Sequence, residues 1–425
     1  MIGTEIHQLA QELFHINRSI TGEGVRETLK KISKHLPKIK IKSVPSGNKV
    51  FDWIVPKEWK VNKAYIITPD GEKICDFSKN ILHLVGYSAP FEGSLSFDEL
   101  KNHLHTLPDQ PNAIPYVTSY YKERWGFCIS QKKFDDLKNG TYKVLVDTNL
   151  FDGELNYGEL LIKGKSKKEI FLSTYICHPA MANDNLSGLT VVTFLAKWLL
   201  EVGNLDYSYR IIFVPETIGS IAYLSHNYKD MKNKIIAGFN ITCVGDDRAY
   251  SYLPSRNGKT ISDLIAKHVL KWIDSNIIKY SWLDRGSDER QYCAPGIDLP
   301  IASILRTKYG KYPEYHTSLD DLESVVTPKG LDRGYWAIRK AIEAIENNKN
   351  YKTTVLCEPQ MGKRGLYPTL SKKGGAEEVS LMMNFISYCD GQTSLLEIAD
   401  YLNLPIWELY DVVDTLKKHN LIDIQ

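Results

Sequence analysis

The sequence predicts an α/β protein with a mostly parallel sheet and helices on both of its faces. Between about residues 160 and 350, apolar runs of strand length alternate with longer segments of helical periodicity. The runs are apolar at nearly every position, whereas a strand with one face in water alternates apolar and polar residues. Buried strands that alternate with helices are typical of a sheet covered on both sides.

The elements of this block follow one another in a regular order. The segment 168–177, KEIFLSTYIC, is expected to be a strand, and the segment 188–202, GLTVVTFLAKWLLEV, a helix. In sheets of this kind, ligands bind beyond the carboxyl ends of the strands. Further strands are expected at 207–216, 235–245 and 299–307, and further helices at 218–228, 261–273 and 330–347.

The regions on either side of this block differ from it in composition. Residues 46–159 are rich in aromatic residues, valine, glycine and proline, with short alternating runs, which predicts a β-rich inserted domain. Residues 1–45 begin with two helical patterns, so 1–45 and 160–350 are expected to form one discontinuous domain. We expect a linker at 351–375 and a winged helix-turn-helix-like domain at 376–425.

Composition and charge argue against several classes of protein. A net charge of +2 is too small to indicate a nucleic-acid-binding surface. No run of about eighteen apolar residues occurs, so we expect no membrane span. The amino-terminal segment is amphipathic and does not have the pattern of a signal peptide. The seven cysteines are odd in number and lack CxxC spacing, which favours reduced thiols and a cytoplasmic protein.

The segment 376–425 is acidic. It carries two lysines and nine carboxylates, a net charge of −7. Proteins that bind DNA need basic contacts to phosphates, so this segment is expected to bind a protein or to mediate oligomerisation. The same pattern is also consistent with helices that merely pack on the body of the protein.

Polar residues follow several of the expected strands. His178 follows the strand at 168–177, and Glu216 ends the next strand. Asp246 and Asp247 follow the third strand, and His316 lies after the fourth. Imidazole nitrogens and carboxylate oxygens are usual ligands of zinc. Because the carboxyl ends of parallel strands share one edge of a sheet, these groups can converge on one metal ion.

Each residue also has a structural explanation. Asp184, six positions after His178, could cap the helix that follows it. Glu216 could serve as a charge at a helix amino terminus, and Asp246 and Asp247 could form a turn. Their joint placement after successive strands favours a shared metal site.

The order of these motifs resembles the M28 family of zinc aminopeptidases. HPAMANDNLSG resembles that family's HxD…DDNxSG, VPETIGSIAYL its EExGLxGS, GSDERQYCAPGIDLPIASI its SDHxxFxxxGIPA, and YHTSLDD its histidine ligand motif. The whole layout resembles the bacterial DUF4910 aminopeptidase-like proteins, with a DUF2172-type β-rich insertion and a winged-helix-like tail. The resemblance implies a phosphorylase/hydrolase-like zinc peptidase fold.

The resemblance also implies roles for individual residues. His178 and His316 would be metal ligands, and Asp184 matches the aspartate that bridges two metals. Glu216 falls where the family has two adjacent glutamates, one a general base and one a ligand. Asp288 matches the aspartate of the SDH motif.

The sequence departs from the family pattern at three places. Ala180 replaces the aspartate of HxD, and PET replaces the pair of glutamates. The aspartate ligand of the family falls on Thr242, so Asp246 or Asp247 would have to take its place; Asp247 is counted among the candidate metal ligands.

These residues best support one zinc ion held by His178, Asp184 and His316. They do not decide whether a second ion binds. Three protein ligands leave a position for water, as catalytic zinc sites require. Glu216 would then be the general base. If Glu216 were instead a fourth ligand, the site would be closed.

The sequence therefore predicts a zinc-dependent aminopeptidase-like hydrolase that cleaves an amide bond of a small peptide or peptide-like conjugate. The alternative is a non-catalytic relative that binds a ligand and carries a protein-interaction tail. We expect a homo-oligomer or a protein partner through the tail or the insertion, with neither membrane nor nucleic acid as a partner.

Overall fold

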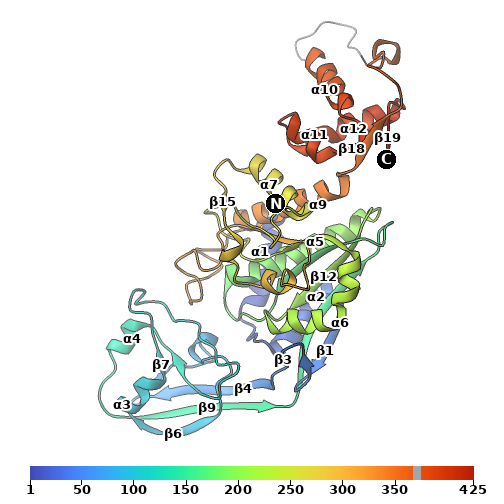
Figure 1. The fold of residues 1–425 in the computed structure, drawn as a ribbon. Coiled ribbons are helices and arrows are strands. Elements are labelled where there is room, and N and C mark those ends of the chain that lie inside the picture. Colours follow the sequence, from blue (N-terminus) through green and yellow to red (C-terminus); the bar gives the residue numbers. More distant parts are fainter. Residues whose placement is uncertain (367–374) are drawn as a thin grey trace. The chain divides into compact units, whose positions relative to one another are not determined.

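The computed structural model describes residues 1–366 and 375–425, which form two compact units (Figure 1). The first unit comprises Met1–Asp263 and Asn276–Trp336, and the second comprises Leu264–Ser275 and Ala337–Gln425. The helices α7 (Ile261–Ile273) and α9 (Pro328–Asn347) contribute residues to both units.

An eight-stranded mixed sheet forms the centre of the first unit, which confirms the predicted α/β class. Its middle strands β12, β11, β13 and β16 are parallel. The pairs β1–β10, β10–β12 and β14–β16 are antiparallel, and β15 pairs parallel with β14. The strand order is β1 (Lys40–Pro45), β10 (Glu154–Ile162), β12 (Ser208–Val214), β11 (Glu169–Tyr175), β13 (Ile235–Asn240), β16 (Ile301–Leu305), β14 (Ser251–Leu253), β15 (Ile278–Lys279).

Helices cover both faces of this sheet. From β11 the chain crosses to β12 through α5 (Gly188–Val202), and then returns across β11 to β13 through α6 (Ile218–Lys234). Right-handed crossovers in opposite directions place their helices on opposite faces. Every residue of β11 is therefore buried, which explains its continuous apolar run. The helices α1 (Ile2–Phe14) and α2 (Glu23–His35) pack with α5.

Within the described residues, one helical segment is long and apolar enough to cross a membrane, Ala182–Val202. Its apolar window is 72% buried inside the protein. It contacts β11 and α1, so it behaves as the core helix of the first unit.

The insertion forms its own antiparallel sheet in the order β5-β4-β9-β6. The range predicted for the insertion, 46–159, includes the first six of the nine residues of β10, but β10 pairs with β1 and β12 of the central sheet. The reason is that strand pairing across the sheet, rather than local composition, decides which sheet a strand joins. The strands are β4 (Glu58–Ile67), β5 (Lys73–Ile74), β6 (Phe91–Ser96) and β9 (Thr141–Phe151).

Shorter elements complete the first unit. In the insertion they are β2 (Lys49–Val50), β3 (Trp53–Ile54), β7 (Leu104–His105), β8 (Phe127–Cys128), α3 (Phe97–Leu100), α4 (Gln131–Asp135), η1 (Ile81–His83) and η2 (Lys101–His103). Around the central sheet they are η3 (Ala182–Ser187), η4 (Trp282–Asp284) and α8 (Glu289–Tyr292).

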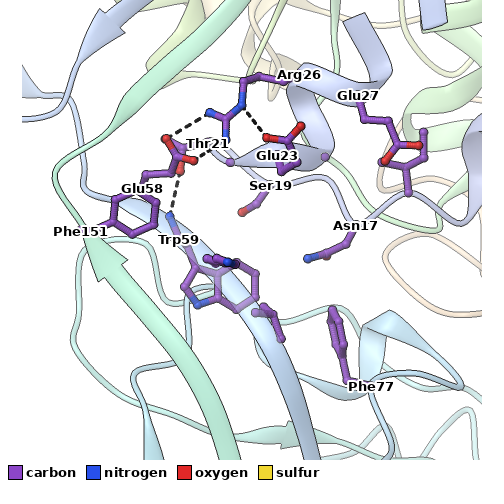
Figure 2. A pocket seen from close by; sticks show the side chains of 15 residues that line it. Asn17, Ser19, Thr21, Glu23, Arg26, Glu27, Glu58, Trp59, Phe77 and Phe151 are labelled. Carbon is purple, nitrogen blue, oxygen red and sulfur yellow. Dashed lines mark hydrogen bonds and ion pairs between the residues drawn. The ribbon is translucent and has the colours of Figure 1, made fainter. Parts of the chain in front are cut away.

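An ion pair joins the insertion to helix α2, which packs against the central sheet. It lies in the wall of a pocket between the loop before α2 and strand β4 (Figure 2). Arg26 of α2 donates to Glu58 of β4 at 2.6 Å and to Asn156 of β10 at 3.1 Å. The Glu58 side chain is 7% exposed and also accepts the backbone N–H of Glu154 at 3.1 Å. Strand β4 of the insertion is thus fixed to helix α2 and to the start of β10.

The second unit contains a three-stranded sheet in the order β18-β17-β19 and several helices. The predicted linker, 351–375, is wrong at its start, because β17 (Asn350–Thr353) pairs with both other strands. Of that predicted linker, residues 367–374 lie outside the described residues. The remaining elements are η5 (Gly362–Arg364), α10 (Gly375–Ser387), β18 (Asp390–Ser394), α11 (Leu395–Tyr401), η6 (Ile406–Leu409), α12 (Tyr410–Lys418) and β19 (Ile422–Ile424).

We predict that Arg26→Ala lowers the free energy of unfolding by about 2 kcal/mol, because Glu58 remains buried without its cation. Burial raises the pKa of Glu58, but the bonds from Arg26 outweigh it and lower that pKa overall. A carboxyl with a lowered pKa stabilises the fold above its unfolded pKa and loses this effect as pH falls. The difference between variant and parent should therefore shrink in acid.

Urea unfolding curves at several pH values measure this change. Lys133→Ala is the matched control, because the Lys133–Glu72 pair, at 2.8 Å, has both side chains exposed to water. That variant should lose less than about 0.5 kcal/mol. Equal losses in the two variants would contradict a stabilising role for the Arg26–Glu58 pair.

Candidate metal centre

Two neighbouring parallel strands carry the first candidate residues to one edge of the central sheet. Tyr175 of β11 lies opposite Val214 of β12, so His178 and Glu216 follow these strands at the same level. Asp184 lies in η3, which leads into α5, and His316 lies in the loop between β16 and α9. The edge shared by the parallel strands is what brings together residues far apart in the sequence.

His178, Asp184 and His316 form a cluster that has the geometry of a metal site. One ligand atom from each lies within 4.8 Å of the others. His316 Nε2 is 3.0 Å from Asp184 Oδ2, and the two imidazole rings lie 5.4 Å apart between centroids. His178 and Asp184 are buried, whereas the His316 side chain is 34% exposed. The structure therefore brings these three predicted ligands together.

The surroundings of the cluster favour the protonation states of His178 and Asp184 that can bind a cation. Burial lowers the pKa of His178 to about 4, and the neighbouring His316 and Arg18 act in the same direction, against the attraction of Asp184. Burial raises the pKa of Asp184, but the two imidazoles and a hydrogen bond from Tyr175 lower it overall. At neutral pH the cluster thus holds a neutral His178 imidazole and a carboxylate, the forms that bind metals.

The second oxygen of Asp184 is already used within the protein. Tyr175 donates a hydrogen bond to Asp184 Oδ1, and the same hydroxyl lies 2.6 Å from the hydroxyl of Thr242. Thr242 stands where the resemblance implies an aspartate ligand. Two neutral hydroxyl groups therefore lie beside Asp184 Oδ1. A second metal ion bound to this oxygen would need a further carboxylate ligand there.

Asp247 is not part of the cluster, so the prediction that it is a metal ligand is wrong. Its carboxylate accepts a hydrogen bond from Thr327 and lies 3.9 Å from the guanidinium of Arg333. Its neighbour Asp246 is buried, but it accepts both the N–H and the hydroxyl of Thr307, at 2.8 and 2.7 Å. Asp246 also accepts a hydrogen bond from the side-chain amide of Asn183 at 3.2 Å, so both carboxylates that follow β13 are bound to other residues of the protein.

Asp320 fixes the loop that carries Asp184, a role that the sequence analysis missed. Its carboxylate accepts the backbone N–H groups of Asn183 and Asp184, at 2.8 and 3.0 Å, and the hydroxyl of Tyr312 at 3.0 Å. Burial raises the pKa of Asp320 to about 7, against the effect of these donors. The only signal in the sequence was its position in the motif YHTSLDD, four residues after His316.

Glu216 lies beside the cluster. Its Oε2 is 3.7 Å from His178 Nε2, and its side chain is 21% exposed. Burial raises the pKa of Glu216 well above its ordinary value, and the charges of Asp288 and Asp184 raise it further. Asp288 itself accepts the N–H of Thr217 at 2.7 Å, so it supports the turn that holds Glu216. A raised pKa makes Glu216 a stronger base than an ordinary carboxylate.

A pocket of about 340 Å³ opens beside the cluster. His178, Glu216 and His316 form its polar wall. The pocket gives a small molecule access to the cluster. The other residues that line it are Ile20, Trp53, Tyr116, Thr118, Tyr120, Tyr121, Cys177, Thr217 and Ile218.

Comparisons with known proteins agree with this architecture. The family model of a domain of unknown function, DUF4910, matches residues 7–348, and a winged helix-turn-helix model matches residues 349–424. A Clostridium acetobutylicum protein, provisionally named a polysaccharide biosynthesis protein with an aminopeptidase-like domain, is 44% identical over 426 residues. That alignment covers 99% of this chain and 96% of that protein.

Solved structures show the same fold. A crystal structure of a protein from Clostridium acetobutylicum, provisionally named a peptidase, has a TM-score of 0.94 and 43% identity. It covers 100% of this chain and 97% of that chain. A zinc aminopeptidase from Bacillus subtilis has a TM-score of 0.59 and 13% identity, with coverage of 81% and 94%. The first unit thus has the fold of the M28-type zinc aminopeptidases, and the chain belongs to the DUF4910 family.

Proposed function

We propose that this protein is a zinc-dependent hydrolase that cleaves an amide bond of a small peptide or peptide-like conjugate. The convergence of His178, Asp184 and His316 beside an open pocket carries this proposal. The names of its relatives support it, because they include an aminopeptidase-like domain and a zinc aminopeptidase of the same fold.

The residues of the cluster fit zinc by their chemistry. Two imidazoles and one carboxylate are a common ligand set of catalytic zinc sites, and they leave a position for water or substrate. When bound, zinc polarises a substrate carbonyl and lowers the pKa of a bound water toward neutrality. The hydroxyl groups of Tyr175 and Thr242 beside Asp184 favour one ion over two.

Glu216 would act as the proton carrier of the reaction. A carboxyl group with a raised pKa can accept the proton of the attacking water and return it to the leaving amine. Glu216 Oε2 lies 3.7 Å from His178 Nε2, and the cluster of His178, Asp184 and His316 is complete without it. This arrangement favours the role of base over that of fourth ligand.

We predict that purified protein binds about one zinc ion per chain and that His178→Ala reduces this to less than a tenth, because a buried ligand is lost. Zinc measured by mass spectrometry after dialysis tests this. His226→Ala, which changes an exposed histidine of α6, is the control and should keep its zinc. Wild-type protein that takes up no zinc would refute the metal site.

We predict that Glu216→Gln lowers hydrolysis by about a thousandfold while zinc is retained, because the amide cannot carry the proton. Release of nitroaniline from a panel of aminoacyl nitroanilides is the measurement. Glu201→Gln, an exposed carboxylate at the end of α5, is the control. Zinc-loaded wild-type protein that cleaves none of the panel would favour a protein that only binds its ligand.

We predict that Asp320→Asn weakens zinc binding by about 10- to 100-fold, as does loss of other groups that orient metal ligands. Each carboxylate oxygen of Asp320 accepts a hydrogen bond from a backbone N–H. In the variant, an amide NH₂ group would replace one of these oxygens, and two donors would face each other. Competition with a fluorescent chelator gives the affinity. Asp321→Asn, a change in the adjacent turn, should leave it unchanged, and equal effects of the two variants would argue against this role.

A further inference from the structure

The insertion is attached directly to the loop that carries His316. The backbone N–H of Tyr116 donates to the carbonyl of His316 at 2.9 Å, and the N–H of Ser318 donates to Ile114 at 2.9 Å. Pro115 and Thr317 form an antiparallel bridge between these two bonds. A segment of the insertion therefore runs as a short strand along the metal-ligand loop.

This attachment places Tyr116 against both histidines of the cluster. The centroid of its ring lies 5.6 Å from that of His178 and 5.2 Å from that of His316. Its hydroxyl is 2.9 Å from the hydroxyl of Tyr120. Aromatic rings at these separations are in contact, so the insertion forms part of the cluster's surroundings.

Further aromatic side chains of the insertion continue this wall. Trp53 and Tyr121 both line the pocket, and their rings meet edge to face at 5.6 Å. Two isoleucines from outside the insertion also line the pocket: Ile20, before α2, and Ile218, at the start of α6. Among the residues that line the pocket, Glu216 alone carries a carboxylate, and no lysine or arginine lines it. Away from the cluster, the pocket is therefore lined by aromatic, aliphatic and uncharged polar side chains.

We propose that the insertion selects the substrate of the hydrolase: its aromatic wall accepts a bulky, uncharged, apolar group on the carbonyl side of the scissile amide. The inference rests on the proposed function. A carbonyl held at the cluster would direct the group attached to it into the pocket. An apolar group gains free energy from burial there, whereas an anionic group would lose its hydration and meet no lysine or arginine among the residues that line the pocket.

Acyl hydroxamic acids test this inference without a known substrate, because the hydroxamate group binds zinc and the acyl group must then occupy the pocket. The probes are acetohydroxamic acid, phenylacetohydroxamic acid and the monohydroxamic acid of succinic acid. Calorimetry with zinc-loaded protein should show the phenylacetyl compound binding about 30-fold more tightly than the acetyl compound, from burial of one phenyl ring. The charged succinyl compound should gain nothing over the acetyl compound.

Variants identify the wall as the cause of this preference. Tyr121→Ala and Trp53→Ala should each reduce the ratio of phenylacetyl to acetyl affinity about fivefold, because part of the apolar contact is lost. Tyr121 and Trp53 are 58% and 37% exposed, so neither change removes a core residue. Tyr401→Ala, which changes a tyrosine of α11 that is 62% exposed, is the matched control and should keep the parent ratio.

The possible outcomes separate the two proposals. Zinc-loaded protein that binds the acetyl and phenylacetyl compounds equally would overturn the selection by the insertion and leave the zinc hydrolase standing. The same conclusion would follow if the preference persisted in both pocket variants. Protein that holds no zinc would overturn the hydrolase and this inference with it.

Discussion

The buried carboxylate of Asp184 is the group on which the rest of the site depends. It is 1% exposed, and its oxygens face different partners, the hydroxyl of Tyr175 and the imidazole of His316. A carboxylate removed from water is costly unless hydrogen bonds and positive charge replace its hydration. Tyr175 and His316 replace part of that hydration, and a cation held between Asp184 and the two imidazoles would supply the positive charge. This need for compensation is the physical reason to expect a metal here.

Holding Asp184 in place requires contributions from distant parts of the chain. Asp320 accepts the N–H groups of the η3 loop, while the His316 loop pairs with the segment around Tyr116 of the insertion. The insertion is anchored again at its base, where Arg26 binds Glu58. The segment around Tyr116 therefore joins the cluster to the aromatic wall of the pocket, so the two form one continuous surface.

The two carboxylates at the cluster are adapted to different tasks by their surroundings. Asp184 faces two imidazoles, which lower its pKa, whereas Glu216 is buried near Asp288 and Asp184, and its pKa is raised. Environments that separate the pKa values of neighbouring acids allow one to stay charged and the other to carry a proton. This division supports one zinc ion with a single glutamate as base, although the M28 pattern has two adjacent glutamates.

The sequence by itself determined the features that depend on local pattern. The apolar runs predicted the buried strands. The polar residues that follow these strands could be recognised as one group, namely His178, Asp184, Glu216 and His316. Tertiary structure decided what depends on pairing between distant segments: the strand β10 in the central sheet, β17 in the second unit, and Asp247 outside the cluster. It also placed Asp320 beneath Asp184 and Tyr116 against the histidines. Burial and periodicity are encoded within a few residues, whereas the partner of a strand or carboxylate is chosen by the packing of the whole domain.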